Sequence, residues 1–345
     1  MSHTYHYPHP FQLESGETLP ALDIVYDVFG KPNEQGDNYV WVCHALTANS
    51  DVADWWPHTL DAGCFIDTTR YCVVCANILG SCYGTTGPLS ENPTTGRPWY
   101  GSFPRVSVRD MVAAHQLLAA HLGISSVAML VGSSIGGFQC VEWAVQQPTF
   151  ARRLVLIATA AKASPWVSAF NASQRMAIET DATWGQPSPQ AALQGMGTAR
   201  SIALLSYRGG KAYCRTQAEP DADGTDGAEP APIFDRRADS YQRYQGLKLQ
   251  RRFNAYSYYR LTEAIDSHDV GRQRGGVAAA LSRIQSTTLV VAITSDILFP
   301  ADDHRQLAAM IPGARLATIT SDFGHDGFLV EHEQLNNIIH QFINS

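Results

Sequence analysis

The stretch that most restricts the fold of this chain is an apolar run that ends in a glycine-rich turn and continues in a helical pattern. Residues 127–131 read VAMLV, residues 132–136 read GSSIG, and residues 141–145 read VEWAV. A short apolar run is typical of a buried strand, and G-x-S-x-G between a strand and a helix is the pattern of a nucleophile elbow. Glycine at positions 132 and 136 leaves room where the strand and the helix nearly touch. The sequence therefore predicts that Ser134 lies at the tip of a strained turn with its hydroxyl exposed.

Further runs of strand length alternate with helical patterns along the chain. They occupy residues 22–29, 39–43, 71–76, 154–158, 288–293 and 315–319. The first run alternates polar and apolar side chains, which is consistent with an antiparallel strand. The others are nearly all apolar, as parallel strands covered on both faces are. The pattern predicts an α/β fold, with a mostly parallel sheet and helices on both of its faces.

The alternation of strands and helices stops between about residue 164 and residue 284. Within that segment Leu249, Phe253 and Tyr256 have the i, i+4, i+7 spacing of a helix face. We therefore expect an α/β-hydrolase core, residues 1–163 and 285–345, into which residues 164–284 are inserted as a helical lid. Residues 218–232 are acidic and rich in Gly, Pro and Ala, which predicts a flexible exposed loop in the lid.

Composition excludes several classes of protein. The formal net charge of −7 argues against nucleic acid as the main partner. No apolar run is long enough to span a bilayer and no signal pattern is visible, so we expect a soluble, cytoplasmic protein without a membrane partner. Seven cysteines, an odd number, indicate free thiols in a reducing compartment. His3, His6 and His9 lie in a polar terminal segment that we expect to be disordered rather than metal-binding.

A serine hydroxyl becomes an effective nucleophile only when a base removes its proton and a third group orients that base. In the α/β-hydrolase fold these groups follow in the order Ser, Asp or Glu, His. Asp296 comes just after the strand at 288–293, and His325 comes after the strand at 315–319. Both therefore lie at carboxyl ends of strands, where such sheets build their sites. We predict Ser134, Asp296 and His325 as a catalytic triad that needs no metal. The alternatives lie in helical or charged contexts: Asp302, Asp303, His304 and His332.

Attack by Ser134 on a carbonyl group creates an oxyanion, which backbone N–H donors must stabilise. One donor is expected to be Ile135, the residue after the nucleophile. The other is expected in His44-Ala45-Leu46-Thr47, directly after an earlier strand, and we predict the N–H of Leu46. The predicted chemistry is acyl transfer through a serine ester. These residues alone do not distinguish a hydrolase from a transferase.

Several motifs resemble the homoserine O-acetyltransferase family, and the resemblance extends over nearly the whole chain. They include VCHALT at 42–47, NILGSCYGTTGP at 77–88, LSYR at 205–208, RFNAYSY at 252–258 and GHDGFL at 324–329. The resemblance implies an enzyme of methionine biosynthesis without a permanently bound cofactor. Acetyl-CoA would acylate Ser134, and the hydroxyl of L-homoserine, deprotonated by His325, would accept the acetyl group in a ping-pong reaction.

The same resemblance implies roles for two charged residues and an oligomeric state. Arg208 would bind the carboxylate of homoserine and Asp326 its ammonium group. A guanidinium fork suits a carboxylate, and a carboxylate suits a cation. Family members are usually homodimers joined through the lid helices, so a homodimer is implied here.

The chain departs from the usual family pattern beside the nucleophile and in one turn. Ser133 and Ile135 stand where the family usually has Gly and Met, and Ser81 stands where it usually has Gly. Succinyl-CoA as donor and L-serine as acceptor therefore remain alternatives. An esterase or deacetylase of the same fold is a further alternative, although a lid that excludes water argues against it. A non-enzymatic binding protein is the weakest alternative, because it would not require the three triad residues.

Overall fold

The computed structural model of the chain describes residues 2–219, 234 and 236–345. Within these residues the main sheet has eight strands in the order β1-β4-β6-β5-β9-β10-β11-β12. Their bounds are His3–Tyr7 (β1), Leu22–Phe29 (β4), Tyr39–Cys43 (β5), Cys72–Ala76 (β6), Val127–Ser133 (β9), Ala151–Ile157 (β10), Thr287–Ile293 (β11) and Arg315–Ile319 (β12). The strands β6, β5, β9, β10, β11 and β12 run parallel to one another, whereas β4 is antiparallel to β6. The predicted mostly parallel sheet, with an early antiparallel strand, is confirmed.

Apolar side chains fill both faces of this sheet, and a single strand contributes to both. In β5, Trp41 and Cys43 belong to one apolar cluster, and Val40 and Val42 belong to the other. Successive side chains of a strand point to opposite faces, so a strand that is covered twice must be apolar throughout. Helices α2 (Val108–His121) and α3 (Ile135–Gln146) cover the first face, and α12 (His332–Ile343) covers the second. A capping box of Ser107 and Asp110 begins α2.

The N-terminal segment is ordered, so the expectation of a disordered segment is wrong. Residues His3–Tyr7 form β1, which pairs antiparallel with β4 from Tyr26 to Leu22. Tyr5 and Tyr7 are half-buried against the core, and the Tyr5 ring stacks on His121 at 4.0 Å between centroids. Aromatic residues at alternate positions suit one face of an edge strand. The polar composition concealed this pattern.

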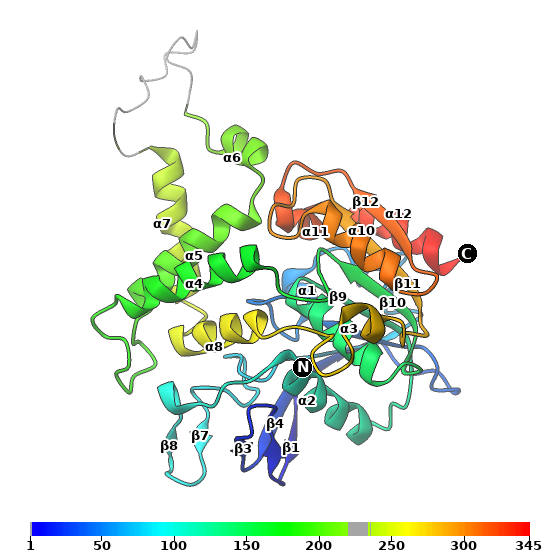
Figure 1. Cartoon of the computed structure of the whole chain (residues 1–345), viewed down its shortest axis with the longest axis horizontal. Helices are drawn as coiled ribbons and strands as arrows, with labels where there is room; N and C mark the ends of the chain where they lie inside the picture. The colour runs from blue at the N-terminus through cyan, green and yellow to red at the C-terminus, as the bar shows by residue number, and fades with distance from the viewer. Residues whose placement is uncertain (1, 220–233, 235) are drawn as a thin grey trace.

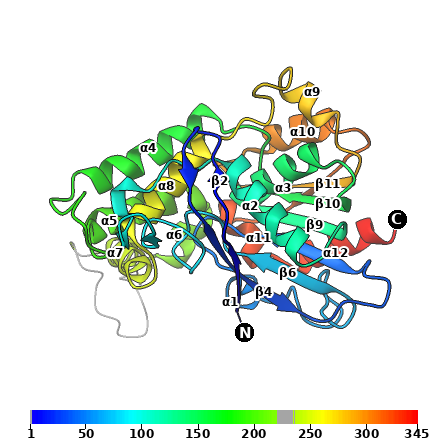
Figure 2. The ribbon, with the colours of Figure 1, turned by 90° about the horizontal axis from the view of Figure 1, so that it is seen from below.

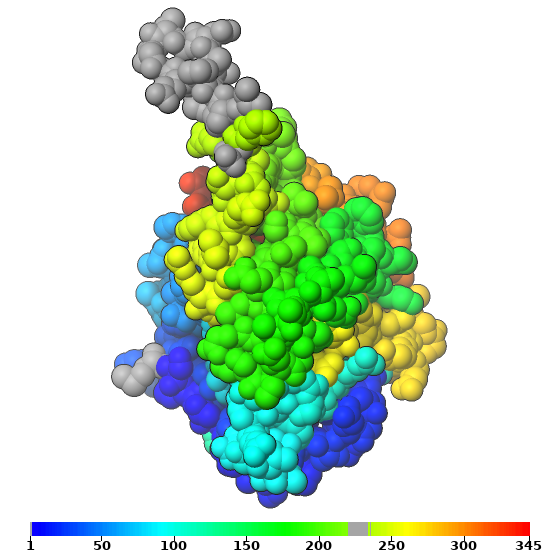
Figure 3. Space-filling view, turned by 90° about the vertical axis from the view of Figure 1, so that its left-hand side faces the viewer, coloured from blue at the N-terminus to red at the C-terminus, as the bar shows by residue number. Residues whose placement is uncertain are grey.

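Helices occupy most of the described part of the chain between β10 and β11. They are α4 (Pro165–Glu179), α5 (Leu193–Tyr207), α6 (Gly210–Thr216), α7 (Arg237–Gln250), α8 (Ala255–Asp266) and α9 (Val277–Leu281). Figures 1 and 2 show α4, α5, α7 and α8 grouped at one side of the sheet. Figure 3 shows the surface that the green and yellow segments of this group form. Only Ala218 and Glu219 of the predicted acidic loop are described; residues 220–232 lie outside the described residues.

Short elements complete the described structure. They are the strands β2 (Phe11–Gln12), β3 (Thr18–Leu19), β7 (Glu91–Asn92) and β8 (Arg97–Pro98), the helices α1 (Val52–Trp55), α10 (Ala301–Met310) and α11 (Gly327–Val330), and the 3-10 turns η1 (Tyr100–Ser102) and η2 (Gly324–Asp326). None of the helices among the described residues combines the length and the apolar character needed to cross a bilayer.

Candidate active site

Ser134 lies between β9 and α3 in a backbone conformation that few residues other than glycine adopt. Its φ is 56° and its ψ is −126°. The backbone holds this conformation in place, because Ser134 N–H donates to Ile157 O at 3.1 Å and Ser134 O accepts from Thr159 Oγ1 at 2.8 Å. Strain of this kind persists only where the surrounding structure enforces it. The predicted strained turn is therefore present.

The two glycines of the motif are required by close backbone contacts. A Cβ atom on Gly132 would overlap the backbone of Gly136, and a Cβ atom on Gly136 would overlap the carbonyl of Cys43. The start of α3 therefore lies directly against the end of β5. This contact brings the segment after β5, which contains Leu46, next to Ser134.

Asp296 and His325 form a buried pair. His325 Nδ1 lies 2.8 Å from Asp296 Oδ2, and the N–H groups of Leu298 and Phe299 donate to Asp296 Oδ1 at 2.8 and 2.9 Å. The carboxylate is therefore oriented by two backbone donors and in turn orients the imidazole. Within the described residues, no hydrogen bond occupies Nε2 of His325. That nitrogen is free to accept a proton from a hydroxyl.

The pKa of His325 reflects two opposing effects. Burial lowers the pKa, but the charge of Asp296, its hydrogen bond and the charge of Asp326 together raise the pKa above the ordinary 6.5. The protonated form is therefore stabilised in the folded protein. A base that must hold a proton during a reaction benefits from this stabilisation.

One cavity of about 400 Å³ joins most of the predicted site residues. Ser134, Leu46, His325, Arg208 and Asp326 all line it. Asp296 lies behind His325 and is 5% exposed. The tertiary structure therefore brings residues from four separate regions of the sequence to a single cavity.

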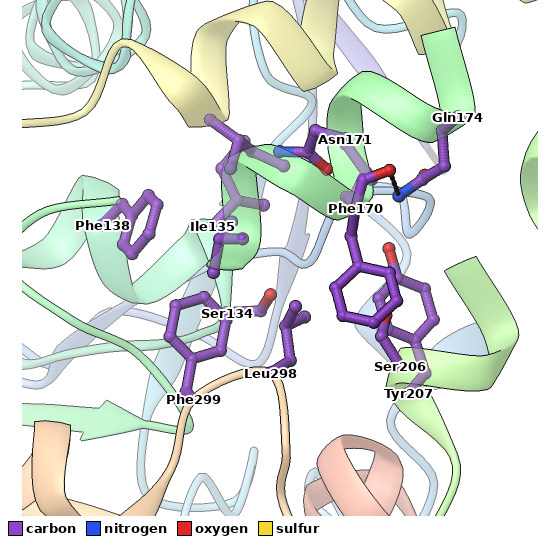
Figure 4. A pocket seen from close by; sticks show the side chains of 13 residues that line it. Ser134, Ile135, Phe138, Phe170, Asn171, Gln174, Ser206, Tyr207, Leu298 and Phe299 are labelled. Atoms are coloured by element: carbon purple, nitrogen blue, oxygen red, sulfur yellow. Dashed lines mark hydrogen bonds between the residues drawn. The ribbon is translucent and has the colours of Figure 1, made fainter. Parts of the chain in front are cut away.

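A second cavity of about 20 Å³ adjoins Ser134, and Leu46 and Ile135 line it as well. Figure 4 shows Ser134 and Ile135 at its wall, with Phe299 and Leu298 beside the hydroxyl and Phe170 across from it. Among the residues that the structure describes, no acceptor is hydrogen-bonded to the backbone N–H of Leu46 or of Ile135. The two predicted oxyanion donors are thus both unoccupied and both near the serine.

Arg208 and Asp326 form an ion pair with each other. Arg208 Nε lies 3.0 Å from Asp326 Oδ2, although this N–H is not aligned for a hydrogen bond. They meet because the backbones of Gly209 and Gly324 touch: a Cβ atom on either glycine would overlap the other segment. The end of α5 and the loop that carries His325 are therefore held together.

Residues that the sequence prediction missed also line the large cavity. Arg200, Lys248 and Arg252 supply positive charge there, and the Arg200 guanidinium lies over the ring of Tyr207 at 5.5 Å. Arg200 precedes Arg208 by eight residues on α5, about two helical turns. For Arg200 this spacing was the available sequence signal, whereas Arg252 begins the RFNAYSY motif at 252–258.

The alternative acid and base residues lie elsewhere. Asp302 and Asp303 are in α10, and His332 begins α12. His304 is buried and accepts a hydrogen bond from Thr159 N–H at 3.0 Å. Among the residues that the structure describes, these four line neither of the two cavities.

Known proteins resemble this chain in both sequence and structure. A family profile described as the alpha/beta hydrolase fold matches residues 38–332. The chain is 42% identical over 330 residues to the homoserine O-acetyltransferase of Cyclobacterium marinum, with 96% of this chain and 92% of that protein covered. Among solved structures, homoserine O-acetyltransferase from Bacillus anthracis matches with a TM-score of 0.90 at 21% identity, covering 100% of this chain and 98% of that chain.

Esterase E22 matches with a TM-score of 0.87 at 22% identity, and 99% of each chain is covered. At these identities the two structural likenesses show the fold alone. The sequence identity to the Cyclobacterium marinum protein is much higher and covers almost the full length of both chains. The chain belongs to the homoserine O-acetyltransferase family and has the alpha/beta hydrolase fold.

Proposed function

We propose that this protein transfers the acetyl group of acetyl-CoA to the hydroxyl of L-homoserine, and that Ser134 carries the acetyl group between the two substrates. The observation that carries the proposal is the shared cavity of Ser134, His325, Arg208 and Asp326. A nucleophile and a base in that cavity supply the chemistry. An adjacent pair of opposite charges complements an amino-acid zwitterion.

In the first half-reaction, His325 removes the proton from Ser134 Oγ, which attacks the thioester carbonyl carbon of acetyl-CoA. The N–H groups of Leu46 and Ile135 stabilise the oxyanion that forms. The carbon–sulfur bond then breaks, and the thiolate of CoA takes the proton from His325. Ser134 is left as an acetyl ester, with His325 neutral again.

In the second half-reaction, His325 removes the proton from the hydroxyl of homoserine, which attacks the acetyl ester of Ser134. The ester bond to Ser134 breaks, and Ser134 Oγ regains the proton from His325. Arg208 holds the carboxylate of homoserine and Asp326 its ammonium group. Because both residues line the same cavity as His325, they determine where the acceptor hydroxyl lies, and orientation of this kind is a large part of catalysis.

The charge of the large cavity supports CoA as the carrier of the acyl group. Four basic and two acidic side chains line the cavity, although the whole chain has a net charge of −7. Within the described residues, Arg200 and Lys248 have no carboxylate at ion-pair distance. The diphosphate and phosphate groups of CoA would supply negative charge for these side chains.

The small cavity supports an acetyl group rather than a succinyl group. Its volume is about 20 Å³, and none of its lining residues is Lys or Arg. A methyl group can enter such a space. The carboxylate of a succinyl group would lose its hydration there without gaining a cation, and burial of an unpaired charge is costly.

We further propose that residues 164–284 act as a lid over the core formed by residues 1–163 and 285–345, in a homodimer. Leu205 of α5 and Tyr244 and Leu247 of α7 are about half exposed, at 55%, 52% and 49%. Side chains of this size on one pair of packed helices suit a contact between two lids. The family membership favours a cytoplasmic enzyme of methionine biosynthesis.

An esterase is the second candidate, because esterase E22 has the same fold. Purified protein should be incubated with acetyl-CoA and either L-homoserine, L-serine or no acceptor, while the release of free thiol is followed. The proposal requires rapid release that depends on homoserine, together with O-acetylhomoserine as product. Equal rates without an acceptor would identify a hydrolase, and a succinyl-CoA preference would refute the assignment of the donor.

A further inference from the structure

His44 lies directly after β5 and is fully buried. Its Nε2 accepts a hydrogen bond from the N–H of Ile78 at 3.1 Å, and its Nδ1 lies 2.8 Å from the carbonyl oxygen of Ala45. An amide N–H can only donate, so Nε2 carries the lone pair and Nδ1 carries the proton. His44 therefore donates from Nδ1 to Ala45 O.

This tautomer is neutral at physiological pH. Burial lowers the pKa of His44 to about 4, and the hydrogen bond to Ala45 opposes that effect only in part. His44 thus offers one fixed donor and one fixed acceptor, and it does not titrate in the range where enzymes of neutral pH work. It cannot serve as the general base of the reaction, since its two ring nitrogens are both engaged.

The acceptor of this hydrogen bond, the carbonyl of Ala45, belongs to the peptide group that also carries a predicted oxyanion donor. The carbonyl of Ala45 and the N–H of Leu46 belong to the same planar trans peptide, so they point in opposite directions. A donor that fixes the carbonyl therefore also fixes the direction of the N–H. A hydrogen bond to the carbonyl polarises the peptide as well, which makes its N–H a stronger donor.

Neighbouring contacts hold the same segment, and one of them shares the carbonyl of Ala45 with His44. Ala48 N–H also donates to Ala45 O, at 3.0 Å, and closes the turn. Arg252 Nη1 donates to Thr47 O at 2.5 Å and holds the peptide between Thr47 and Ala48. The imidazole of His44 and the N–H of Ala48 both donate to Ala45 O. Two hydrogen bonds to this oxygen can fix the tilt of the peptide plane, whereas one bond alone would leave that tilt free.

We propose that His44 is a positioning residue that directs the Leu46 N–H at the oxyanion. The inference rests on the proposed function, in which Leu46 supplies one of the two donors. Outright removal of an oxyanion donor costs about 10²–10³-fold in kcat. Because the turn hydrogen bond of Ala48 remains, we expect loss of the His44 donor to cost about 10- to 100-fold.

Two matched substitutions separate the two hydrogen bonds of His44. In His44→Asn the amide nitrogen lies near the former Nδ1 and can still donate to Ala45 O. In His44→Gln the amide oxygen lies near the former Nε2 and can still accept from Ile78 N–H, but the donor to Ala45 is lost. The rate of Ser134 acetylation should be measured by rapid mixing with acetyl-CoA and intact-protein mass spectrometry. The affinity for methylboronic acid, which adds to a serine hydroxyl as a tetrahedral anion, should be measured in parallel.

The expected result is that His44→Gln acetylates about 10- to 100-fold more slowly, with an unchanged KM for acetyl-CoA, and binds methylboronic acid more weakly by a similar factor. His44→Asn should remain within several-fold of the wild type in both measurements. Equal losses in the two variants, or losses that follow their melting temperatures, would overturn the proposal. A wild-type protein that never forms acetyl-Ser134 would instead refute the proposed function itself.

A measurement on the unmodified protein covers the case in which neither variant folds. Nitrogen NMR of labelled histidine should show the proton of His44 on Nδ1, with no titration between about pH 5 and pH 9. Addition of methylboronic acid should move the amide resonances of Leu46 and Ile135 downfield. A proton on Nε2, or a Leu46 resonance that does not move, would refute the positioning role.

Discussion

Replacement of Arg208 by alanine should separate the two half-reactions of the proposed mechanism. Arg208 lies at the end of α5, where it pairs with Asp326, and among the described residues no hydrogen bond or ion pair joins it to Asp296 or to the predicted oxyanion donors. The variant should therefore still form acetyl-Ser134 from acetyl-CoA. Transfer to homoserine should become much slower, because the acceptor loses the partner of its carboxylate.

The size of the effect follows from the interaction that is lost. A hydrogen bond to a charged group contributes about 1.5–3 kcal/mol. At about 1.4 kcal/mol for each factor of ten, this corresponds to a loss of homoserine affinity of about 10- to 150-fold. The rate at saturating homoserine should fall as well, since the hydroxyl is no longer held near His325.

The assay is rapid mixing of the variant with acetyl-CoA, followed by intact-protein mass spectrometry with and without homoserine. Acetyl-Ser134 should accumulate and discharge slowly into homoserine. Arg215→Ala is the matched control, because Arg215 is an exposed arginine that pairs with Asp322 in the neighbouring loop. It should behave as the wild type. If Arg208→Ala fails to acetylate while the control acetylates normally, Arg208 serves the CoA half-reaction, and the proposed acceptor site is wrong.

Three further predictions test the nucleophile, the base and the core. Ser134→Ala should reduce thiol release by about a millionfold without loss of folding, and retention of a tenth of the activity would exclude Ser134 as nucleophile. Because His325 must be neutral to accept a proton and its pKa lies above 6.5, the rate should fall as the pH drops through that raised pKa. Asp326→Asn removes one charge that raises this pKa, so the acidic limb of the acetylation rate should move to lower pH; a shift to higher pH would contradict the reasoning. Glu142 is 1% exposed and paired with Arg274, so Glu142→Gln should destabilise the fold by about 3 kcal/mol in urea unfolding, and an unchanged midpoint would refute that role.

The sheet and the nucleophile turn could be predicted because they depend on local patterns. Strands covered on both faces must be apolar throughout. The sharp turn from strand to helix needs glycine at 132 and 136, because a Cβ atom at either position would overlap neighbouring backbone, such as the carbonyl of Cys43 in the case of Gly136. The order Ser134, Asp296, His325 was readable because each residue lies in the turn or loop that follows a recognisable strand. The same local reasoning failed for residues 3–7, since nothing in a polar segment reveals that a distant strand offers it a free edge.

Only the tertiary structure decided how the charged and buried polar residues are partnered. Arg208 and Asp326 are 118 positions apart, and their pairing depends on the contact between Gly209 and Gly324. From the sequence, His44 was visible only as part of a motif. Its tautomer could not be predicted, because it depends on a hydrogen bond from Ile78, 34 residues away. Hydrogen bonds and ion pairs act over a few ångströms regardless of sequence separation, so their partners follow from the packing of distant segments and not from any periodicity along the chain.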